Sequence, residues 1–304
     1  MVELYHMTAD SVRTLKLSRA EEQRLYDAWK EFEAKAPAYA RFQLRPENCV
    51  ITCYESGKTV FQGKDAAVYA APFEDVPSVS LSSSPFAQTN DILPQAGSDE
   101  VGTGDYFGPV CVCAAIVTEA DMALIRDLGV RDSKKLTDKE IREIAPKLMK
   151  QLKYSLLIVD NPTYNRVHQN NNLNAIKAKL HNQAYVNLAK KAQLPSFIII
   201  DQFAPAPVYY SYLKKEQSVI RGIHFETKAE DHYPAVGAAS LIARYGFLVT
   251  MDKMEETWGM AFQKGAGSAV DECGAEFVRK HGEENLGRVA KLHFKNTDKI
   301  KAAV

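Results

Sequence analysis

Residues 96–117 read AGSDEVGTGDYFGPVCVCAAIV, two strand-like runs joined by a glycine-rich segment. The first run ends with the adjacent acids Asp99 and Glu100, and the second is apolar throughout, which is typical of a buried strand. Side chains alternate between the two faces of a strand, so in a regular strand these carboxylates would point apart. Either one acid is a surface charge, or the strand ends or distorts just before Gly102 and both acids reach one site.

Strand-like and helix-like runs follow one another through the rest of this region. The strand-like runs cover residues 154–160, 196–201 and 218–229, and the helix-like runs cover 119–128, 138–152, 174–192, 234–258 and 269–281. Thr137 with Glu140 has the spacing of a capping box, and Pro234 suits the first turn of a helix. Strands mixed with helices of this length predict a layered α/β domain.

A helix followed by antiparallel strands is predicted near the N-terminus. Ser18 and Glu21 have capping-box spacing, and an apolar stripe continues at helical intervals from Leu25 to Ala36. Residues 39–63 then alternate between apolar and polar side chains, which is typical of antiparallel strands beneath such a helix.

The chain is therefore expected to have three parts. Residues 1–72 form a small α+β domain, and residues 73–94, rich in Ser and Pro, form a linker. Residues 95–304 form the α/β domain, a mixed sheet flanked by helices.

The bulk composition is that of a globular protein without net charge. The 304 residues include 38 Lys and Arg and 38 Asp and Glu, which weighs mildly against indiscriminate nucleic-acid binding, although a basic face remains possible. The five cysteines include no Cys-x-x-Cys pair, which favours buried reduced thiols over disulfides. The first residues lack a signal-peptide core, and no run approaches the ~18 apolar residues that span a bilayer. We expect a cytoplasmic protein without a membrane partner.

Further acids stand where strands give way to helices. Asp201 ends one apolar run, and Glu230 and Asp231 precede the helix expected at Pro234. Ligands of open α/β sheets bind beyond the carboxyl ends of the strands, so these acids and Asp99 are candidates for one site. Each also has a structural interpretation, because an Asp after a buried strand is often only a turn or cap residue.

Several motifs follow in order along the α/β region: DEVGTGDYFGPV, RDSKKLTD, NNLNAIKAKLHNQA, IDQF, KAEDHYPAVGAASLIARYGFL and KLHFKNT. Together, over about residues 95–298, they resemble bacterial ribonuclease HIII, a relative of ribonuclease HII. The N-terminal segment YESGKTVFQG resembles the TATA-box-binding-protein-like domain of that family. The resemblance implies a ribonuclease H-like mixed sheet flanked by helices, preceded by a small α+β domain.

The resemblance implies four catalytic, metal-binding acids: Asp99, Glu100, Asp201 and Glu230. The fourth position is found by counting back from Pro234, and Asp231 is its rival. Crowded carboxylates repel one another unless a cation neutralises them, and all-oxygen ligands favour Mg²⁺ or Mn²⁺. Two such ions about 3.5–4 Å apart can activate water and stabilise the leaving oxygen in the reacting complex.

Residues expected to bind the substrate are Gly102, Thr103, Gly104, Ser133, Lys134, Lys135, Asn172, Asn174, Lys228 and Arg244. The two glycines lack Cβ, which allows a nucleic-acid backbone to approach closely, although a tight turn would explain them equally. The lysines suit phosphate contacts, but loop lysines are often only solvated. The Asn-rich segment could instead cap the next helix, and we expect His181 to be a structural helix residue.

The resemblance further implies endonucleolytic hydrolysis of the RNA strand of RNA/DNA hybrids, leaving 5′-phosphate and 3′-hydroxyl ends. No obligate protein partner is evident. One alternative is ribonuclease HII-like incision at single ribonucleotides in DNA, but Thr103 replaces the middle residue of that enzyme's Gly-Arg-Gly. The other is a non-catalytic nucleic-acid-binding protein, against which the retention of all four acids argues.

Overall fold

The computed structural model describes residues 12–70, 73, 92–130 and 136–304. The chain divides into two compact units, one of Met1–Phe86 with Ala204–Lys214 and one of Ala87–Phe203 with Lys215–Val304. Most of the expected linker, and the predicted substrate-binding residues Ser133, Lys134 and Lys135, lie outside the described residues. Each unit is described separately below.

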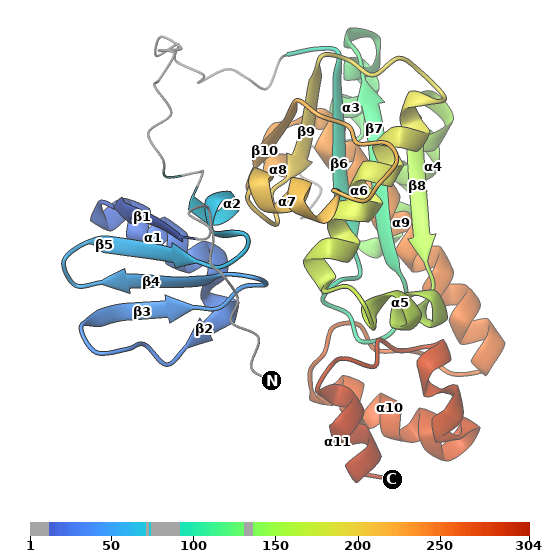
Figure 1. Cartoon of the computed structure of the whole chain (residues 1–304). Helices are drawn as coiled ribbons and strands as arrows, with labels where there is room; N and C mark the ends of the chain where they lie inside the picture. Colours follow the sequence, from blue (N-terminus) through green and yellow to red (C-terminus); the bar gives the residue numbers. More distant parts are fainter. Residues whose placement is uncertain (1–11, 71–72, 74–91, 131–135) are drawn as a thin grey trace. The chain divides into compact units, whose positions relative to one another are not determined.

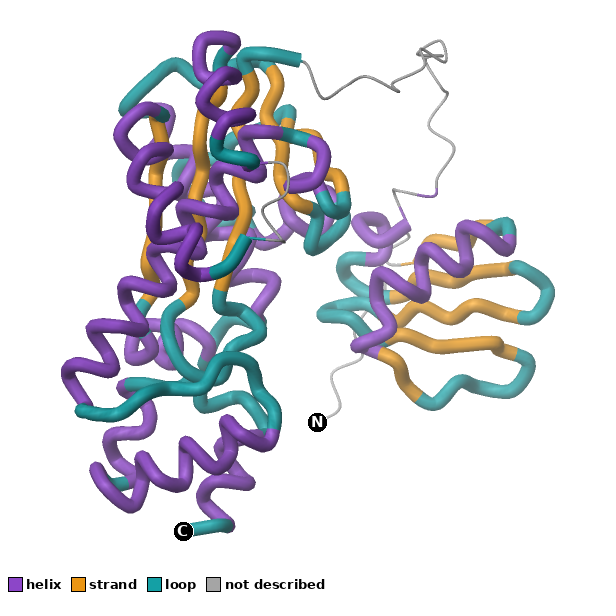
Figure 2. Tube along the Cα trace, turned by 180° about the vertical axis from the view of Figure 1, so that it is seen from behind, coloured by secondary structure: helices purple, strands orange, loops and turns teal. Residues whose placement is uncertain are grey.

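The first unit has one antiparallel sheet in the order β1-β5-β4-β3-β2, crossed on one face by α1 (Figure 2). Its elements are β1 (Val12–Lys16), α1 (Arg19–Trp29), η2 (Lys30–Phe32), β2 (Glu33–Ala34), β3 (Ala40–Leu44), β4 (Val50–Tyr54), β5 (Lys58–Gln62), α2 (Ala66–Ala70) and α7 (Ala206–Tyr212). Leu25 and Trp29 of α1 are buried, as are Phe42 and Leu44 on β3. The predicted α+β character of this part is confirmed.

The first helix is shorter than its apolar stripe predicts. The capping box of Ser18 and Glu21 is present, but α1 ends at Trp29. Glu33 and Ala34 are extended and pair with β3, so strand pairing prevails over the helical pattern beyond that point. The stripe from Leu25 to Ala36 is therefore not one helix.

The second unit is built on a mixed sheet in the order β10-β9-β6-β7-β8 (Figure 1). Its strands are β6 (Gln95–Val101), β7 (Val110–Val117), β8 (Lys153–Val159), β9 (Phe197–Asp201) and β10 (Ile223–Glu226). β6, β7 and β8 pair antiparallel, whereas β9 runs parallel to both β6 and β10. The predicted mixed sheet flanked by helices is confirmed.

Helices cover both faces of this sheet, with α6 in front and α9 behind in Figure 1. The helical segments are η5 (Glu119–Asp121), α3 (Met122–Asp127), α4 (Asp138–Gln151), α5 (Asn161–His168), α6 (Leu173–Ala189), α8 (Ala229–His232), α9 (Pro234–Trp258), α10 (Ser268–His281), η7 (Glu283–Arg288) and α11 (Asn296–Ala302). The predicted strand over residues 218–229 is wrong in extent, because only β10 forms and the chain then turns into α8.

The helix α9 is long and apolar enough to span a membrane, which corrects the expectation that no such run exists. Its most apolar window is 72% buried inside the protein, so tertiary packing accounts for its composition. It lies against β6 and β7, with Ala239 and Ala243 among its buried residues.

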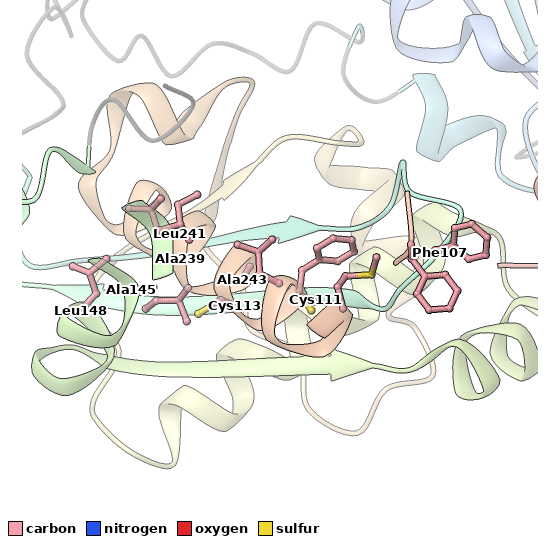
Figure 3. Packing of buried hydrophobic residues seen from close by; sticks show 14 of the residues in the cluster. Phe107, Cys111, Cys113, Ala145, Leu148, Ala239, Leu241 and Ala243 are labelled. Carbon is pink, nitrogen blue, oxygen red and sulfur yellow. The ribbon is translucent and has the colours of Figure 1, made fainter. Parts of the chain in front are cut away.

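Small side chains let α9 lie close to the sheet (Figure 3). Cys111 and Cys113 of β7 are buried free thiols packed in the same cluster as Ala239, Ala243 and Leu148. Burial raises the pKa of the Cys111 thiol to about 12. These cysteines therefore act as small apolar residues, as the sequence predicts.

The helix α9 approaches the sheet closely at Gly97 of β6. A Cβ at this position would lie 2.3 Å from the backbone nitrogen of Val236 and 2.6 Å from the carbonyl carbon of Ala235. Neither atom belongs to a flexible side chain, so a larger residue at position 97 must push α9 and β6 apart. The glycine therefore fixes the distance between the strand that carries Asp99 and the helix behind it.

We predict that Gly97→Ala lowers the free energy of unfolding by about 2 kcal/mol through this backbone clash. Urea denaturation followed by circular dichroism measures the change. Gly104→Ala is the matched control, since no atom lies within 4 Å of its Cβ position. Equal stability of the two variants would contradict this account of the packing.

Candidate active site

Three separate segments bring carboxylates to one edge of the second sheet. Asp99 lies near the end of β6, and Asp201 is the last residue of β9. The parallel register pairs Ser98 with Ile200, so Asp99 and Asp201 follow as neighbours on adjacent strands. The Oδ1 atom of Asp201 accepts a hydrogen bond of 2.9 Å from the backbone N–H of Ala229, which brings the start of α8 against this strand end.

The adjacent acids leave opposite faces of β6. Gly97 and Asp99 face α9, where Ser240 hydrogen-bonds the Asp99 carboxylate. Ser98 and Glu100 face α6, where both contact His181. The strand ends at Val101, as one of the two expectations has it, but it pairs regularly with β7 up to that residue, so no distortion turns both acids to one side.

The position at the strand end nevertheless couples the acids electrostatically. Burial raises the pKa of Asp99 well above its usual value, and the charges of Glu100 and Asp201 raise it further. Burial also raises the pKa of Asp201, to about 6, against the hydrogen bond from Ala229 and with the charges of Glu230 and Glu100. The cluster thus holds more negative charge than its surroundings stabilise, and a cation would relieve it.

Glu100 has two side-chain partners on α6. Its Oε1 atom forms an ion pair with the Nζ atom of Lys177, and its Oε2 atom lies 2.8 Å from Nε2 of His181. Burial opposes ionisation of Glu100, but His181 and Lys177 outweigh it, so the pKa of this carboxyl is lowered. From the sequence, His181 is expected to be only a structural helix residue. The four-residue spacing of Lys177 and His181, which places both on one face of a helix, is the signal that could have linked them.

The structure separates the two candidates for the fourth acid. Glu230 is 9% exposed and close enough to Asp201 for its charge to raise the pKa of that carboxyl, whereas Asp231 is exposed. Among the described residues, no three His, Cys, Asp or Glu side chains gather as closely as the ligands of one ion. The donor set still fits a hard divalent cation, because all four groups are carboxylates and two of them have raised pKa values.

The glycine-rich loop after β6 divides into a structural and an open position. Gly102 has a φ of +94°, and a Cβ there would lie 2.2 Å from the carbonyl oxygen of Pro109 and 3.0 Å from the ring of Phe247. Gly102 is therefore required by its own turn, which corrects the expectation that it makes room for a nucleic acid. Gly104 has open space around its Cβ position, and Thr103 between them is half-buried.

Lys291 holds this loop through hydrogen bonds to its backbone, a role that is not predicted from the sequence. Its fully buried Nζ donates hydrogen bonds to the carbonyl oxygens of Asp105, at 2.7 Å, and Gly108, at 2.6 Å. Burial lowers the pKa of this ammonium group to about 8. The motif KLHFKNT contains two lysines, and nothing in the local sequence marks Lys291 as the buried one.

The other predicted contact residues have mixed placements. Asn172 caps α6, its Oδ1 atom accepting a hydrogen bond from Ala175, which is the structural alternative for the Asn-rich segment. Asn174 is partly exposed in the first turn of that helix, and Lys228 is exposed in the left-handed conformation just before α8. Arg244 forms an ion pair of 2.8 Å with Asp138, so its guanidinium is used within the fold.

The raised pKa of Asp201, about 6, predicts a pH-dependent penalty in the metal-free protein. The folded state holds this proton where the unfolded chain has lost it, so stability falls as pH rises from about 4 to about 6 and stays lower above that. We predict that Asp201→Asn stabilises the chelator-treated protein at about pH 8 by about 1 kcal/mol, after allowance for solvent screening.

The same comparison at about pH 4 should give no difference, because both side chains are then neutral. Differential scanning calorimetry measures both conditions. Asp231→Asn is the control, since this exposed carboxylate is outside the cluster. A destabilised Asp201→Asn at the higher pH would show that the buried charge is already compensated.

Comparisons with known proteins identify the family of the chain. The sequence pattern of the family described as ribonuclease HII matches residues 96–297, and a domain of unknown function, DUF3378, matches residues 13–85. Ribonuclease HIII of Bacillus subtilis is 45% identical over 278 residues, which are 88% of this chain and 89% of the relative. Ribonuclease HIII of a Geobacillus strain is 41% identical, covering 96% of this chain and 97% of the relative.

A solved structure, Bst-RNase HIII in complex with Mn²⁺, has a TM-score of 0.69 and 40% identity, covering 96% of this chain and 98% of its own. The expected ribonuclease H-like fold with an additional N-terminal domain is thereby confirmed. The chain belongs to the ribonuclease HII family and, within it, to the ribonuclease HIII enzymes.

Proposed function

We propose that this ribonuclease cuts the RNA strand of RNA/DNA hybrids endonucleolytically, with two divalent cations, and leaves 5′-phosphate and 3′-hydroxyl ends. The observation that carries the proposal is the electrostatic contact among four carboxylates from three separate segments: Asp99, Glu100, Asp201 and Glu230. Without a cation, repulsion within such a cluster destabilises the folded state, so a purely structural role does not account for it. The relative solved with Mn²⁺ supports a divalent ion as that cation.

The four acids would hold Mg²⁺ or Mn²⁺ through carboxylate oxygens. Bound ions of this type lower the pKa of water and stabilise charge on the phosphate oxygens during in-line displacement. Asp99 and Asp201 stand side by side on neighbouring strands, and Glu230 adds a buried carboxylate from α8. Glu100 approaches from the α6 face with its orientation fixed by two donors.

The open backbone at Gly104 supports contact with the strand that is cut. A sugar-phosphate backbone can come close there, since no atom lies within 4 Å of the Cβ position. The buried ammonium of Lys291 fixes the carbonyl oxygens on either side of Tyr106 and Phe107, which holds the neighbouring part of the loop in place. The 2′-hydroxyl groups of an RNA strand distinguish it from DNA at such a site.

We predict that Asp201→Asn abolishes hydrolysis, lowering kcat by about a thousand-fold or more, while hybrid affinity stays within about two-fold. The amide retains the acceptor for Ala229 but removes a charge needed to hold cations. Cleavage of a labelled hybrid with Mg²⁺ and fluorescence anisotropy measure the two properties. Substantial cleavage by this variant would remove Asp201 from the proposed metal centre.

The adjacent acids at the start of α8 offer a matched pair for the fourth ligand. Glu230→Gln is expected to reduce kcat strongly, and Asp231→Asn to leave it unchanged, because only the first is buried beside Asp201. The reverse result would assign the fourth position to Asp231.

We propose that the sheet of the first unit increases affinity for the hybrid. Lys16 on β1 and Lys58 on β5 pair directly across the sheet, and both are exposed, as is Gln62. Like charges directly opposite each other repel, a cost that an anionic partner would offset. The strands β1 and β5 therefore expose a pair of lysines with which an anionic partner could interact.

The double variant Lys16→Ala/Lys58→Ala is expected to raise KM for the hybrid by about three- to ten-fold and to leave kcat unchanged. The effect should decrease at higher salt, because phosphate contacts are screened. Lys30→Ala is the control, since this exposed lysine follows α1. An equal rise in KM for the double variant and for Lys30→Ala would argue against a binding role for this sheet face. A fall in kcat with unchanged KM in the double variant would argue against it as well.

A further inference from the structure

A polar stripe runs along the buried side of α6. Lys177, His181 and Tyr185 occupy successive turns of this helix and are 9%, 0% and 0% exposed. Side chains four residues apart lie on one helix face, so the three residues form one row. Buried polar groups of this kind are costly unless each has a partner.

Each residue of the row has a partner on the neighbouring strands. The Nδ1 and Nε2 atoms of His181 lie 2.7 Å from Ser98 Oγ and 2.8 Å from Glu100 Oε2. Lys177 pairs with the other oxygen of Glu100, and its Nζ atom lies 4.1 Å from the ring centroid of Phe203.

Tyr185, the most C-terminal residue of the row, has a different partner. The Tyr185 hydroxyl donates to the carbonyl oxygen of Ile199 in β9, also interacts with the Ser98 side chain, and does not touch Glu100. It therefore belongs to the same row as Lys177 and His181 and helps to hold α6 against the sheet without contacting Glu100.

The direction of the hydrogen bonds follows from the chemistry of these groups. An ionised carboxylate only accepts, so Nε2 of His181 donates to Glu100. In the neutral ring Nδ1 then accepts from the Ser98 hydroxyl, which fixes the tautomer. The imidazole is thereby held between Ser98 and Glu100 of β6, and its N–H group fixes the position of one Glu100 oxygen.

We propose that His181 and Lys177 are positioning residues with opposite effects on metal binding. His181 orients Glu100 as a metal ligand, whereas Lys177 compensates the charge of Glu100 before a divalent ion binds and must release it afterwards. This inference rests on the proposed function, in which Glu100 is one of the metal ligands. Partners that orient a ligating carboxylate typically contribute about 10- to 100-fold in metal affinity.

The two effects have opposite signs because the two partners differ in charge. An ammonium group and a divalent cation compete for the same carboxylate oxygen, so Lys177 opposes binding. An N–H donor on the other oxygen only fixes its direction, so His181 favours binding. Loss of packing alone would weaken binding in both cases, which makes the difference in sign informative.

The test is a titration of the full-length protein with Mn²⁺ in the absence of substrate, following free Mn²⁺ by electron paramagnetic resonance. We expect His181→Leu to weaken Mn²⁺ binding by about ten-fold, and His181→Gln, which keeps an N–H donor, to recover part of this loss. Lys177→Met, which keeps the buried stem, should tighten binding by several-fold. Tyr185→Phe should lower the melting temperature and leave the affinity unchanged.

The inference is overturned if Lys177→Met binds Mn²⁺ no more tightly than Tyr185→Phe, or if His181→Leu binds like wild type. Should His181→Leu fail to fold, the comparison of Lys177→Met with Tyr185→Phe decides by the same criterion. Asp99→Asn in the same titration distinguishes a failure of the proposed metal centre from a failure of the roles proposed for Lys177 and His181. Wild-type affinity in Asp99→Asn would overturn the proposed metal centre, whereas its loss beside unchanged α6 variants would overturn only the roles of Lys177 and His181.

Discussion

Repulsion among buried carboxylates is the constraint around which the second unit is organised. Asp99 and Asp201 end neighbouring strands, and burial makes the charge of each costly to its neighbour. A hydrophobic core usually excludes such groups. Here the protein surrounds them with an apolar sheet and two helices, so the stability of the fold must come from the core and not from the site. The rigid packing of α9 on small residues such as Gly97 provides that support.

The alternation of a single strand distributes the site over two layers. Asp99 is supported by α9 and Glu100 by α6, although the residues are adjacent in the chain. Each carboxylate thus has its own electrostatic environment: the pKa of Asp99 is raised by burial and neighbouring charge, and that of Glu100 is lowered by His181 and Lys177. Two identical chemical groups acquire different properties because one residue step along a strand changes the face of the sheet.

The sequence was sufficient for the elements with strong periodicity and for the acids at strand ends. β7 and α9 were predicted with their observed bounds, and the capping boxes at Ser18 and Thr137 are present. Short elements such as α5 and α8 were missed, because four to eight residues carry too little periodicity.

The partners of Glu100 could not be derived from local patterns. A helix with Lys177, His181 and Tyr185 on one face is equally consistent with a solvated stripe, and only the sheet position of Ser98 and Glu100 makes that stripe a buried one. Arg244 is a further example, since this basic residue, expected to contact the substrate, also forms an ion pair with Asp138 that its sequence context does not indicate. Charge alone does not distinguish a group that faces a ligand from one that completes the fold.

The glycine-rich loop illustrates how distant parts of the chain determine a local conformation. Its turn requires a glycine only at position 102, whereas the carbonyl oxygens of Asp105 and Gly108 are fixed by an ammonium group from the C-terminal region. Lys291 is satisfied by these backbone oxygens and by its position near the Tyr164 ring, and the charge of the Asp105 carboxylate offsets part of the cost of burying the ammonium group. Because this one group donates to the carbonyl oxygens of both Asp105 and Gly108, it holds the two ends of the turn together. The conformation of the loop therefore depends on a side chain that is distant in sequence, which no local pattern around residues 102–108 could indicate.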